Sequence, residues 1–385
     1  MRDSTIIQPC NESGFLDAAL YSQFGVVSVD WSNAKQLWVQ PPMRCEELLV
    51  EQAAQLKAAR PGVRVMGYRN IVKALPWFSS VRARMDDPQY SDWFLPFDTH
   101  NSTPYHVPQC DNNFSPPKCS PLYHDQEQTP GFPHGDGNCP GPCDCGVHPC
   151  GEYLFSYENA TANGLADWIV NDFILGPTGL GNTNLSGFYL DDEWYNYSLF
   201  PGGCSGSPVG GPTEEDKNCL VDMGHAGDIA WTTHVADTWC AIRHRAFAAA
   251  IAAGGWFWQM FSLQTTPIQA TCATTLRGFC EAGASSAFYN ATTMHSLSGS
   301  HETTPNLAQD LATFLLLRGP YAFLGFHWSG CGNAVVFPDS LAVDYGTPTG
   351  FCSETAPSSN VFVRDWTNAT VEMDCNTYKG TITMK

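Results

Sequence analysis

The residues with the clearest chemical potential lie in the segment Gly187-Phe188-Tyr189-Leu190-Asp191-Asp192-Glu193-Trp194. The first four residues are apolar or aromatic and predict a strand that is covered on both faces. Asp191, Asp192 and Glu193 follow at once, and adjacent carboxylates repel one another unless the protein uses their charge. In parallel α/β folds, functional groups gather at the carboxyl ends of strands. The segment therefore predicts a catalytic strand end.

Two carboxyl groups on one face of a strand are suited to splitting a glycosidic bond. Hydrolysis of that bond needs one carboxyl that donates a proton and a second that acts as nucleophile, base or charge stabiliser. Residues two apart in an extended segment share a face, so Asp191 and Glu193 are expected to point together. Repulsion and burial should raise the pKa of one of them, which suits a proton donor near neutral pH. Asp192 is expected to point the other way unless the strand has already ended. A purely structural role also stays open, in which the three acids cap a helix or bind calcium.

The elements that would carry this segment alternate between extended and helical patterns. Extended apolar runs occupy residues 26–31, 63–68, 152–157, 187–191, 256–261, 286–290, 321–326 and 361–364. Helical spacing of apolar residues occurs between many of them, for example over residues 45–59 and 307–317. Eight strands alternating with helices predict a single α/β domain over residues 1–385, a (β/α)8 TIM-like barrel with short strands at its C-terminal end. A doubly wound sheet would accommodate the same order.

Two segments interrupt this alternation. Residues 98–150, between the second and third predicted strands, are rich in Cys, Pro and Gly, and a Gly/Pro-rich loop occupies residues 199–218. A loop as long as the first is usually functional or cross-linked. Residues of the first insertion that could form a lid or bind a divalent metal are His124, Asp125, Glu127, His134 and Asp136. The spacing of Cys139, Cys143 and Cys145 is compatible with zinc, but clustered cysteines in an oxidising compartment more often form disulfides.

If the barrel forms, the residues that follow its strands face one pocket. Acids, amides and flat aromatic rings predominate among them, and such rings stack on sugars while the polar groups bond hydroxyls. The predicted substrate-binding residues are Asp30, Trp31, Tyr68, Arg69, Asn70, Glu158, Trp194, Gln259, Tyr289, Asn290, His327, Trp328, Arg364 and Trp366. For Trp31, Trp328, Trp366 and His327, ordinary core packing is an equal alternative. The sequence contains no glycine-rich phosphate loop and no Gly-x-Ser-x-Gly turn, which argues against nucleotides and serine-hydrolase chemistry.

Composition favours an exported protein that acts on carbohydrate. Asp and Glu number 38 against 19 Lys and Arg, and the net charge of −19 argues against nucleic acid and anionic membranes as partners. Sixteen cysteines are unusual in a reduced cytosolic enzyme. N-linked glycans are predicted at some of the sequon residues Asn11, Asn101, Asn113, Asn159, Asn184, Asn196, Asn290 and Asn368. No apolar run is long enough to span a membrane. The first residues lack the apolar core of a signal peptide, so the chain is expected to be the mature or trimmed form of a secreted protein that requires no cofactor.

The acidic segment resembles the fourth strand of the family-eighteen chitinases. Their motif runs Asp-Gly-x-Asp-x-Asp-x-Glu followed by an aromatic residue, and here the matching string is Gly187-x-x-x-Asp191-x-Glu193-Trp194. The resemblance implies that Glu193 is the general acid and that Asp191 assists the acetamido group of the substrate. The chain departs from the motif at Ser186 and Tyr189.

Two further parts of the chain bear on this resemblance. Tyr289-Asn290 is similar to a Tyr-Asp pair of the same family, with Asn in place of Asp, and Trp366 is similar to its floor tryptophan. A looser resemblance is to barrel hydrolases whose fourth strand ends in Leu-Asp-Asp. That resemblance implies that Asp191 or Asp192 is a direct nucleophile or charge stabiliser.

The sequence thus predicts a secreted, disulfide-bonded glycoside hydrolase that cleaves O-glycosidic bonds with retention. Glu193 is the expected acid, and Asp191 or Asp192 its partner. The departures from the chitinase pattern keep a rival open, namely a non-catalytic carbohydrate-binding or cell-surface glycoprotein on the same scaffold. A metal-dependent esterase or lyase is a third alternative that rests on the insertion alone.

Overall fold

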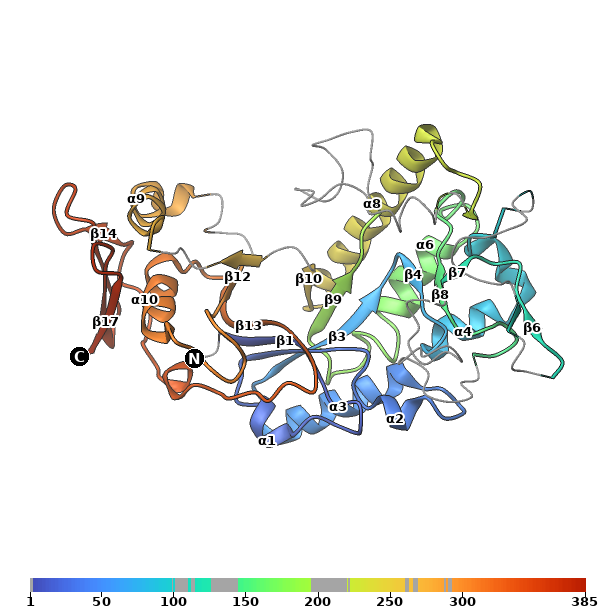
Figure 1. The fold of residues 1–385 in the computed structure, drawn as a ribbon, viewed down its shortest axis with the longest axis horizontal. Coiled ribbons are helices and arrows are strands. Elements are labelled where there is room, and N and C mark those ends of the chain that lie inside the picture. Colours follow the sequence, from blue (N-terminus) through green and yellow to red (C-terminus); the bar gives the residue numbers. More distant parts are fainter. Residues whose placement is uncertain are drawn as a thin grey trace.

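A computed structural model describes residues 3–98, 100, 110–111, 115–125, 145–194, 220, 222–259, 263–265, 269–286, 289 and 293–385 (Figure 1). Its centre is an eight-stranded sheet in the order β10-β9-β3-β2-β1-β13-β12-β11, in which all pairs are parallel. The strands are β1 (Ser4–Cys10), β2 (Val26–Val29), β3 (Arg64–Asn70), β9 (Gly187–Asp191), β10 (Trp256–Gln259), β11 (Leu263–Thr265), β12 (Thr293–Ser296) and β13 (Ala322–Cys331).

The sheet curls strongly on itself. Although four strands separate β10 from β13, the rings of Trp256 and Phe323 lie with centroids 6.0 Å apart, and the guanidinium of Arg64 on β3 lies 4.6 Å from the Trp256 ring centroid. These three side chains therefore share the concave face. The order follows the chain around a ring, and β13 pairs with β1, but within the described residues β10 and β11 form the two edges of the sheet. The predicted α/β class and parallel sheet are confirmed, whereas closure of a full barrel remains a prediction.

Helices cover the outer face of the sheet. Alongside it run α3 (Cys45–Ala59), α8 (Ile229–Ala252) and α10 (Leu307–Leu317), and α9 (Cys272–Ala282) lies farther toward the C-terminal end of the chain (Figure 1). The shorter helices are α1 (Ala18–Tyr21), α2 (Lys35–Trp38), α4 (Ser79–Met85) and α6 (Leu165–Trp168), which continues as a wider turn over Ile169–Ile174, together with single turns at Pro88–Trp93, Gly283–Ser285 and Asp339–Ala342. No helix of the described segments is long and apolar enough to cross a membrane.

Three smaller sheets are antiparallel. β4 (Lys73–Ala74), β8 (Glu152–Leu154) and β7 (His124–Asp125) form one, and β5 (Cys110–Asp111) pairs with β6 (Lys118–Cys119) in another. The C-terminal sheet consists of β14 (Ser353–Glu354), β15 (Val361–Asp365), β16 (Ala369–Asp374) and β17 (Lys379–Met384), and it packs on α10. The predicted C-terminal strands are therefore confirmed.

Several predicted strands were assigned wrongly. The run 152–157 contributes β8 to a small sheet, and the run 361–364 lies in the C-terminal sheet, so neither belongs to the parallel sheet. Of the run 286–290, residues 286 and 289 lie in no strand, and the others lie outside the described residues. β1, β11 and β12 were missed instead. The main insertion consequently lies between β3 and β9, which are the third and fourth strands of the parallel sheet along the sequence.

Disulfides cross-link the chain as predicted. The described bridges are Cys10–Cys331, Cys110–Cys119, Cys145–Cys150, Cys272–Cys375 and Cys280–Cys352, whereas Cys45 is a buried free thiol. Two of these bridges fall in the insertion. Cys139 and Cys143 lie outside the described residues.

Candidate active site

The carboxyl ends of β3 and β9 bring several of the predicted residues together on the concave face. Parallel register places Tyr68 beside Tyr189 and Asn70 beside Asp191. The rings of Tyr68 and Tyr189 stack with centroids 6.4 Å apart, and Trp328 of β13 meets Tyr189 edge-on at 6.5 Å. That last contact spans the curled sheet, because β13 and β9 are separated by three strands. An aromatic floor thus lies beneath the acids.

Asp191 and Asp192 form the centre of the site. Gly187 lets β9 approach β10 closely, since a Cβ there would lie 2.1 Å from the carbonyl oxygen of Trp256. The strand ends at Asp191, and Asp192 adopts a left-handed backbone with φ of 55°. The Tyr68 hydroxyl donates to Oδ2 of Asp191 at 2.7 Å, and Nδ2 of Asn70 donates to Oδ2 of Asp192 at 2.7 Å. One hydrogen-bond network therefore holds both carboxyls, because the Asn70 amide also lies 3.3 Å from the Tyr68 hydroxyl.

A lysine from the small sheet completes the network. Nζ of Lys73 lies 3.5 Å from Oδ2 of Asp192 and 2.7 Å from Oε2 of Glu152 on β8. Burial alone would lower the pKa of Lys73, but the charge of Glu152, followed by that of Asp192, raises it above its usual value. Lys73 therefore stays protonated between its two carboxylate partners.

The two aspartates experience different environments. Burial, followed by the charge of Asp192, raises the pKa of Asp191 to about 7, while the Tyr68 hydrogen bond and the Lys73 charge oppose the rise. Asp192 is more open and receives donors from Asn70 and Lys73. Pairs of acids whose environments differ in this way divide into a proton carrier and a charged partner.

Asp30 is a second acid with a raised pKa. It follows β2, is almost fully buried, and accepts the backbone N–H of Ser32 at 2.7 Å. Burial raises its pKa to about 6, against the hydrogen bonds from Ser32. Burial is the main reason that the pKa of Tyr189 is raised, and the charges of Asp191 and Asp30 raise it further. Because both charges act on one side chain, the two acids lie on the same side of the sheet.

Glu193 interacts with α8, and the extended alternation that would point it with Asp191 is broken at Asp192. The left-handed residue Asp192 ends the strand, so Asp192 rather than Glu193 joins Asp191. The charge of Glu193 acts on Arg243 of α8, where it opposes the lowering of the arginine pKa by burial. Trp194 follows and meets Trp231 of α8 edge-on, with centroids 6.1 Å apart.

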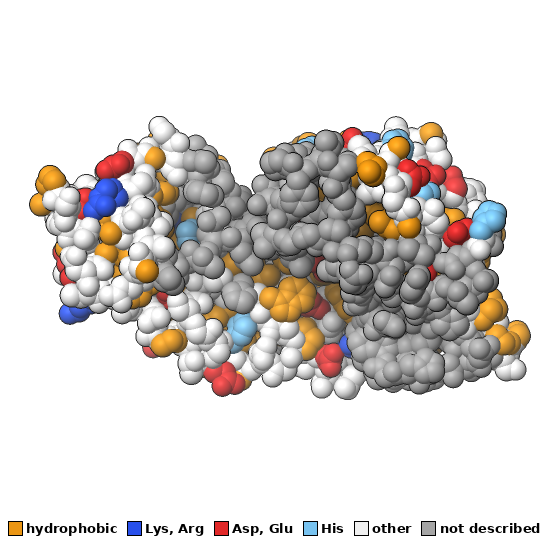
Figure 2. Space-filling model, turned by 45° about the horizontal axis from the view of Figure 1, so that its top comes forward, with side chains coloured by type: hydrophobic (Ala, Val, Ile, Leu, Met, Phe, Trp, Pro, Cys, Tyr) orange, Lys and Arg blue, Asp and Glu red, His pale blue; other side chains and the backbone are white. Residues whose placement is uncertain are grey.

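Of the other predicted binding residues, the structure favours two. Trp328 is 45% exposed above Tyr189, which is unusual for so large a ring and suits sugar stacking. Trp31 is half-buried and stacks on Trp77 at 4.7 Å, with Tyr68 on another side at 6.5 Å. On the face shown in Figure 2, apolar side chains lie in the recess between the two halves of the molecule. Residues of which the structure does not describe the side chain are Gln259, Asn290 and His327.

Four predicted binding residues are placed away from the acids. Arg69 points to the outer face, where it pairs with buried Glu46 at 3.4 Å and lies against the rings of Phe78, Phe173 and Phe188. Side chains alternate along β3, so the side chains of Arg69 and Tyr68 lie on opposite faces of the sheet. Arg364 donates to the carbonyl oxygens of Leu315, Leu316 and Arg318. Trp366 is fully buried beneath Arg318, and Tyr289 packs on Phe351. These contacts give the four side chains packing roles, and a part for them in substrate binding stays a prediction.

Glu158 belongs to a junction beside the site. Its carboxylate accepts the indole N–H of Trp231 and lies 3.8 Å from Nε2 of His225, whose ring stacks on Trp231 at 3.8 Å. This cluster ties the end of β8 to the start of α8, next to Trp194.

The described part of the insertion places none of its candidate lid or metal residues beside the two aspartates. His124 is fully buried on β7, stacks on Tyr153 at 5.0 Å and meets the carbonyl oxygen of Leu122 through Nδ1, so it is a core residue and not part of a lid. Only the backbone of Asp125 is described, and Glu127, His134 and Asp136 lie outside the described residues. Within the described ranges no group of three or more His, Cys, Asp or Glu side chains could hold a metal ion. Lys73 and Glu152 are the site residues that sequence reasoning missed, since nothing local marks two residues this far apart in the chain as partners.

Comparisons with known proteins add little to this geometry. No family model and no curated protein matches the chain. One similar solved structure is the sucrose 6F-phosphate phosphorylase from Thermoanaerobacter thermosaccharolyticum, with 9% identity and a TM-score of 0.45 over 99% of this chain and 95% of that one. Another is an acarbose-soaked Nostoc punctiforme debranching enzyme, with 11% identity and a TM-score of 0.37 over 96% of this chain and 75% of that one. Scores this low support no argument about this chain, and none of these comparisons shows the resemblance to chitinases.

Proposed function

We propose that this chain is a glycoside hydrolase of an oxidising, extracellular environment, with Asp191 and Asp192 as its working carboxyls. The observation that carries the proposal is the contrast between these two neighbours. Asp191 is buried with a pKa raised to about 7, while Asp192 accepts donors from Asn70 and Lys73 at the mouth. A proton carrier next to a charged carboxylate is what hydrolysis of a glycosidic bond requires.

The chemistry divides between the two residues. Asp191 donates its proton to the oxygen of the departing sugar, and Asp192 attacks or stabilises the positive charge that develops on the sugar ring. Neighbouring residues keep their carboxyls close, and a separation of about 5–5.5 Å corresponds to retention of configuration. Trp328 and Trp31 supply flat faces for the pyranose rings.

The surroundings support carbohydrate as the substrate class and export as the setting. The described disulfides favour an oxidising compartment. The sequon residues Asn11, Asn159 and Asn368 are exposed and Asn184 is half-exposed, so glycans could be attached there without unfolding the chain.

Hydrolysis of a panel of 4-nitrophenyl glycosides and of polysaccharides tests the proposal. Asp191→Asn and Asp192→Asn should each lower kcat on order of 10²–10⁴-fold, because each removes one half of the acid and carboxylate pair. Asp228→Asn is a matched control, because this acid caps α8 through the Trp231 N–H at 3.0 Å and lies outside the network. Glu193→Gln should cost less than either aspartate variant, and a larger loss there would return the acid role to Glu193.

Three outcomes would reassign the protein. Full activity in both aspartate variants would remove these residues from the chemistry. Sugar binding on a glycan array without release of sugar from any substrate would instead assign the non-catalytic carbohydrate-binding role. Activity that disappears in chelator would favour a metal-dependent esterase or lyase.

A further inference from the structure

The small antiparallel sheet of β4, β8 and β7 contacts Asp192 through two consecutive ion pairs. Glu152 on β8 contacts Lys73 on β4 at 2.7 Å, and Lys73 contacts Asp192 on β9 at 3.5 Å. The side chain of Glu152 is 11% exposed, while those of Lys73 and Asp192 are 30% and 32% exposed. The anchored end of the chain is therefore buried, and the open end lies at the mouth of the site.

Asn70 fixes the geometry of this contact from the other side. Its Oδ1 accepts the backbone N–H groups of Val72 at 2.9 Å and of Lys73 at 2.7 Å. The oxygen and nitrogen of the amide cannot be exchanged without losing both bonds, so Nδ2 must point to Asp192. Two donors, the Asn70 amide and the Lys73 ammonium, thus meet at one oxygen of Asp192. These two contacts fix the position of that oxygen beside Asp191.

A lone cation in a carbohydrate site has an obvious second explanation, which is that it binds the carboxylate or sulfate of an acidic sugar. The charges around Lys73 argue against this. The acids Asp191, Asp192 and Glu152 act on it together. Tyr68, Tyr189 and the buried acid Asp30 are further titratable groups described on this side of the sheet. Three carboxyls against one ammonium leave the pocket negative when they are ionised, which repels an anionic ligand. Between residues 3 and 385, the segments that the structure does not describe contain a single Lys or Arg, which is Lys217.

We infer that Lys73, anchored by Glu152, is a positioning residue that holds the Asp192 carboxyl in place beside Asp191. The inference rests on the proposed function for its catalytic meaning, but the charge arrangement itself can be tested without any substrate. It assigns the small antiparallel sheet a specific task, because β4 brings the Lys73 ammonium, and β8 its partner Glu152, to the end of β9. It also implies uncharged sugars as the substrate class.

The decisive experiment follows the ionisation of the aspartates in the full chain. Aspartate labelled with carbon-13 at the carboxyl carbon is titrated by NMR in wild type, Lys73→Met, Lys73→Arg and Glu152→Gln, with Asp191→Asn and Asp192→Asn used to assign the signals. In Lys73→Met the pH range over which Asp191 loses its proton should move upward from about 7, because the Lys73 charge favours ionisation of Asp191. Lys73→Arg should restore the wild-type range, and Glu152→Gln should lie between the two. An unchanged titration in Lys73→Met would overturn the inference.

A matched control and a kinetic split separate this inference from the proposed function. Lys57→Met removes a lysine that contacts Ser186 at the other end of β9, at 3.2 Å, and should leave the titration unchanged. On an uncharged glycoside, Lys73→Met should lower kcat on the order of 10²-fold with little change in KM, as misplacement of a catalytic group does. A rise in KM confined to glucuronides or sulfated sugars would instead show that Lys73 binds an anion, and would overturn the inference. If wild type hydrolyses nothing, the proposed function fails and the titration alone decides the role of Lys73.

Discussion

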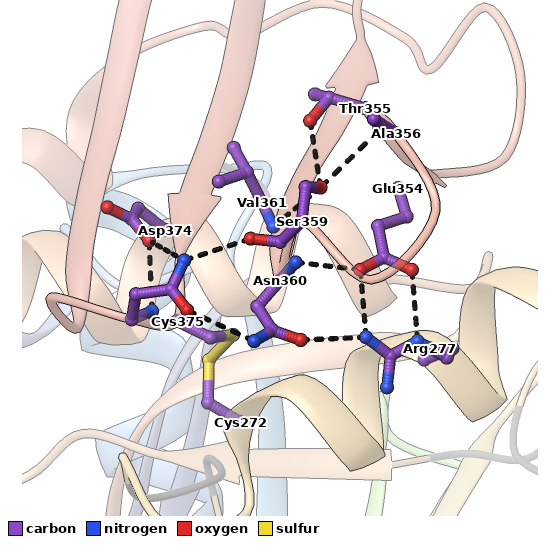
Figure 3. A network of polar contacts seen from close by, with 11 residues as sticks. Cys272, Arg277, Glu354, Thr355, Ala356, Ser359, Asn360, Val361, Asp374 and Cys375 are labelled. Carbon is purple, nitrogen blue, oxygen red and sulfur yellow. Dashed lines mark hydrogen bonds and ion pairs between the residues drawn. A yellow bond between two sulfur atoms is a disulfide. The ribbon is translucent and has the colours of Figure 1, made fainter.

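Two ionic networks in this molecule pair carboxylates with one basic side chain and balance the charges in opposite ways. At the end of β9, Asp191, Asp192 and Glu152 converge on a single Lys73. At the junction of α9 with the C-terminal sheet, Glu354 faces Arg277, whose Nε and Nη2 donate to its two oxygens at 2.9 and 2.8 Å (Figure 3). The first network has a surplus of negative charge, and the second is matched.

The matched network is also completed by amides. The backbone N–H of Asn360 donates to Glu354 at 2.7 Å, and its side-chain oxygen accepts from Arg277 at 2.8 Å (Figure 3). Asn376 then bonds the other end of the Asn360 side chain at 3.0 Å, beside the disulfide Cys272–Cys375. Hydrogen bonds from Arg277 are the main reason that the pKa of Glu354 falls to about 2.

The difference distinguishes an ionic network that stabilises the fold from one that is suited to chemistry. A fork-shaped guanidinium satisfies both oxygens of a carboxylate and keeps it charged at any ordinary pH. At the end of β9, burial and then the charge of Asp192 outweigh the single ammonium of Lys73, so Asp191 is ready to hold a proton near neutrality. Perturbed pKa values of this second kind mark functional sites more often than structural ones.

Removing the disulfide of the junction should have the largest effect on stability. The bridge Cys272–Cys375 closes a loop with a sequence separation of 103 residues and joins α9 to the segment after β16. Replacing both cysteines by alanine should lower the free energy of unfolding by about 2–4 kcal/mol, because the unfolded chain gains freedom. Urea titration with tryptophan fluorescence measures this loss.

The same variant tests whether the two networks are independent. Glycosidase activity at 25 °C should remain within a factor of about two, since changes at distant sites without shared partners act additively. A loss of activity comparable to that of Asp192→Asn would break the comparison, because it would show that the junction supports the site. Asp192→Asn is the reciprocal control, with activity lost and the fold retained.

The sequence predicted the centre of the site better than the frame around it. The run 187–191 was predicted as a strand and is β9, because a short apolar run bounded by Gly and acids has few other solutions. β1 was missed because Ser4, Thr5, Gln8 and Pro9 interrupt its apolar residues, although all seven of its residues are buried. A strand that turns part of one face to a polar interior does not show an apolar run.

The misplaced eighth strand has a different cause. Val361-Phe362-Val363 is a continuously apolar run, but in β15 only Phe362 and Arg364 are buried, whereas Val361 and Val363 are half-exposed. One-sided burial is typical of antiparallel sheets, and the valines hide it in the sequence. Likewise, no local pattern shows that Asp192 takes a left-handed conformation. That conformation brings Asp192, and not the expected Glu193, into one hydrogen-bond network with Asp191.

The pH dependence of stability should separate the networks by sign, beginning with the site. Burial raises the pKa of Asp191 to about 7 in the folded state, above about 3.9 in the unfolded chain. This group therefore stabilises the fold fully below pH ~4, and its contribution is lost as the pH rises through about 7. Asp191→Asn should match wild type near pH 4 and be more stable at pH 8. Urea unfolding at the two pH values measures the difference, and equal stability at pH 8 would contradict the raised pKa.

At the junction the opposite slope is expected, with the smallest effect of the series. The pKa of Glu354 is depressed to about 2 by Arg277, so its contribution is present above the unfolded value of about 4.3 and is lost as the pH falls through 2. Glu354→Gln should be less stable than wild type at pH 7, and the two should converge toward pH 2. Thermal unfolding across this range measures the convergence, with Glu372→Gln, an exposed acid of β16 in the same sheet, as the control. A Glu354→Gln deficit that stays constant from pH 7 to pH 2 would mean that the carboxylate acts through its shape alone, and the contrast between a matched and an unmatched network would then lose its electrostatic basis.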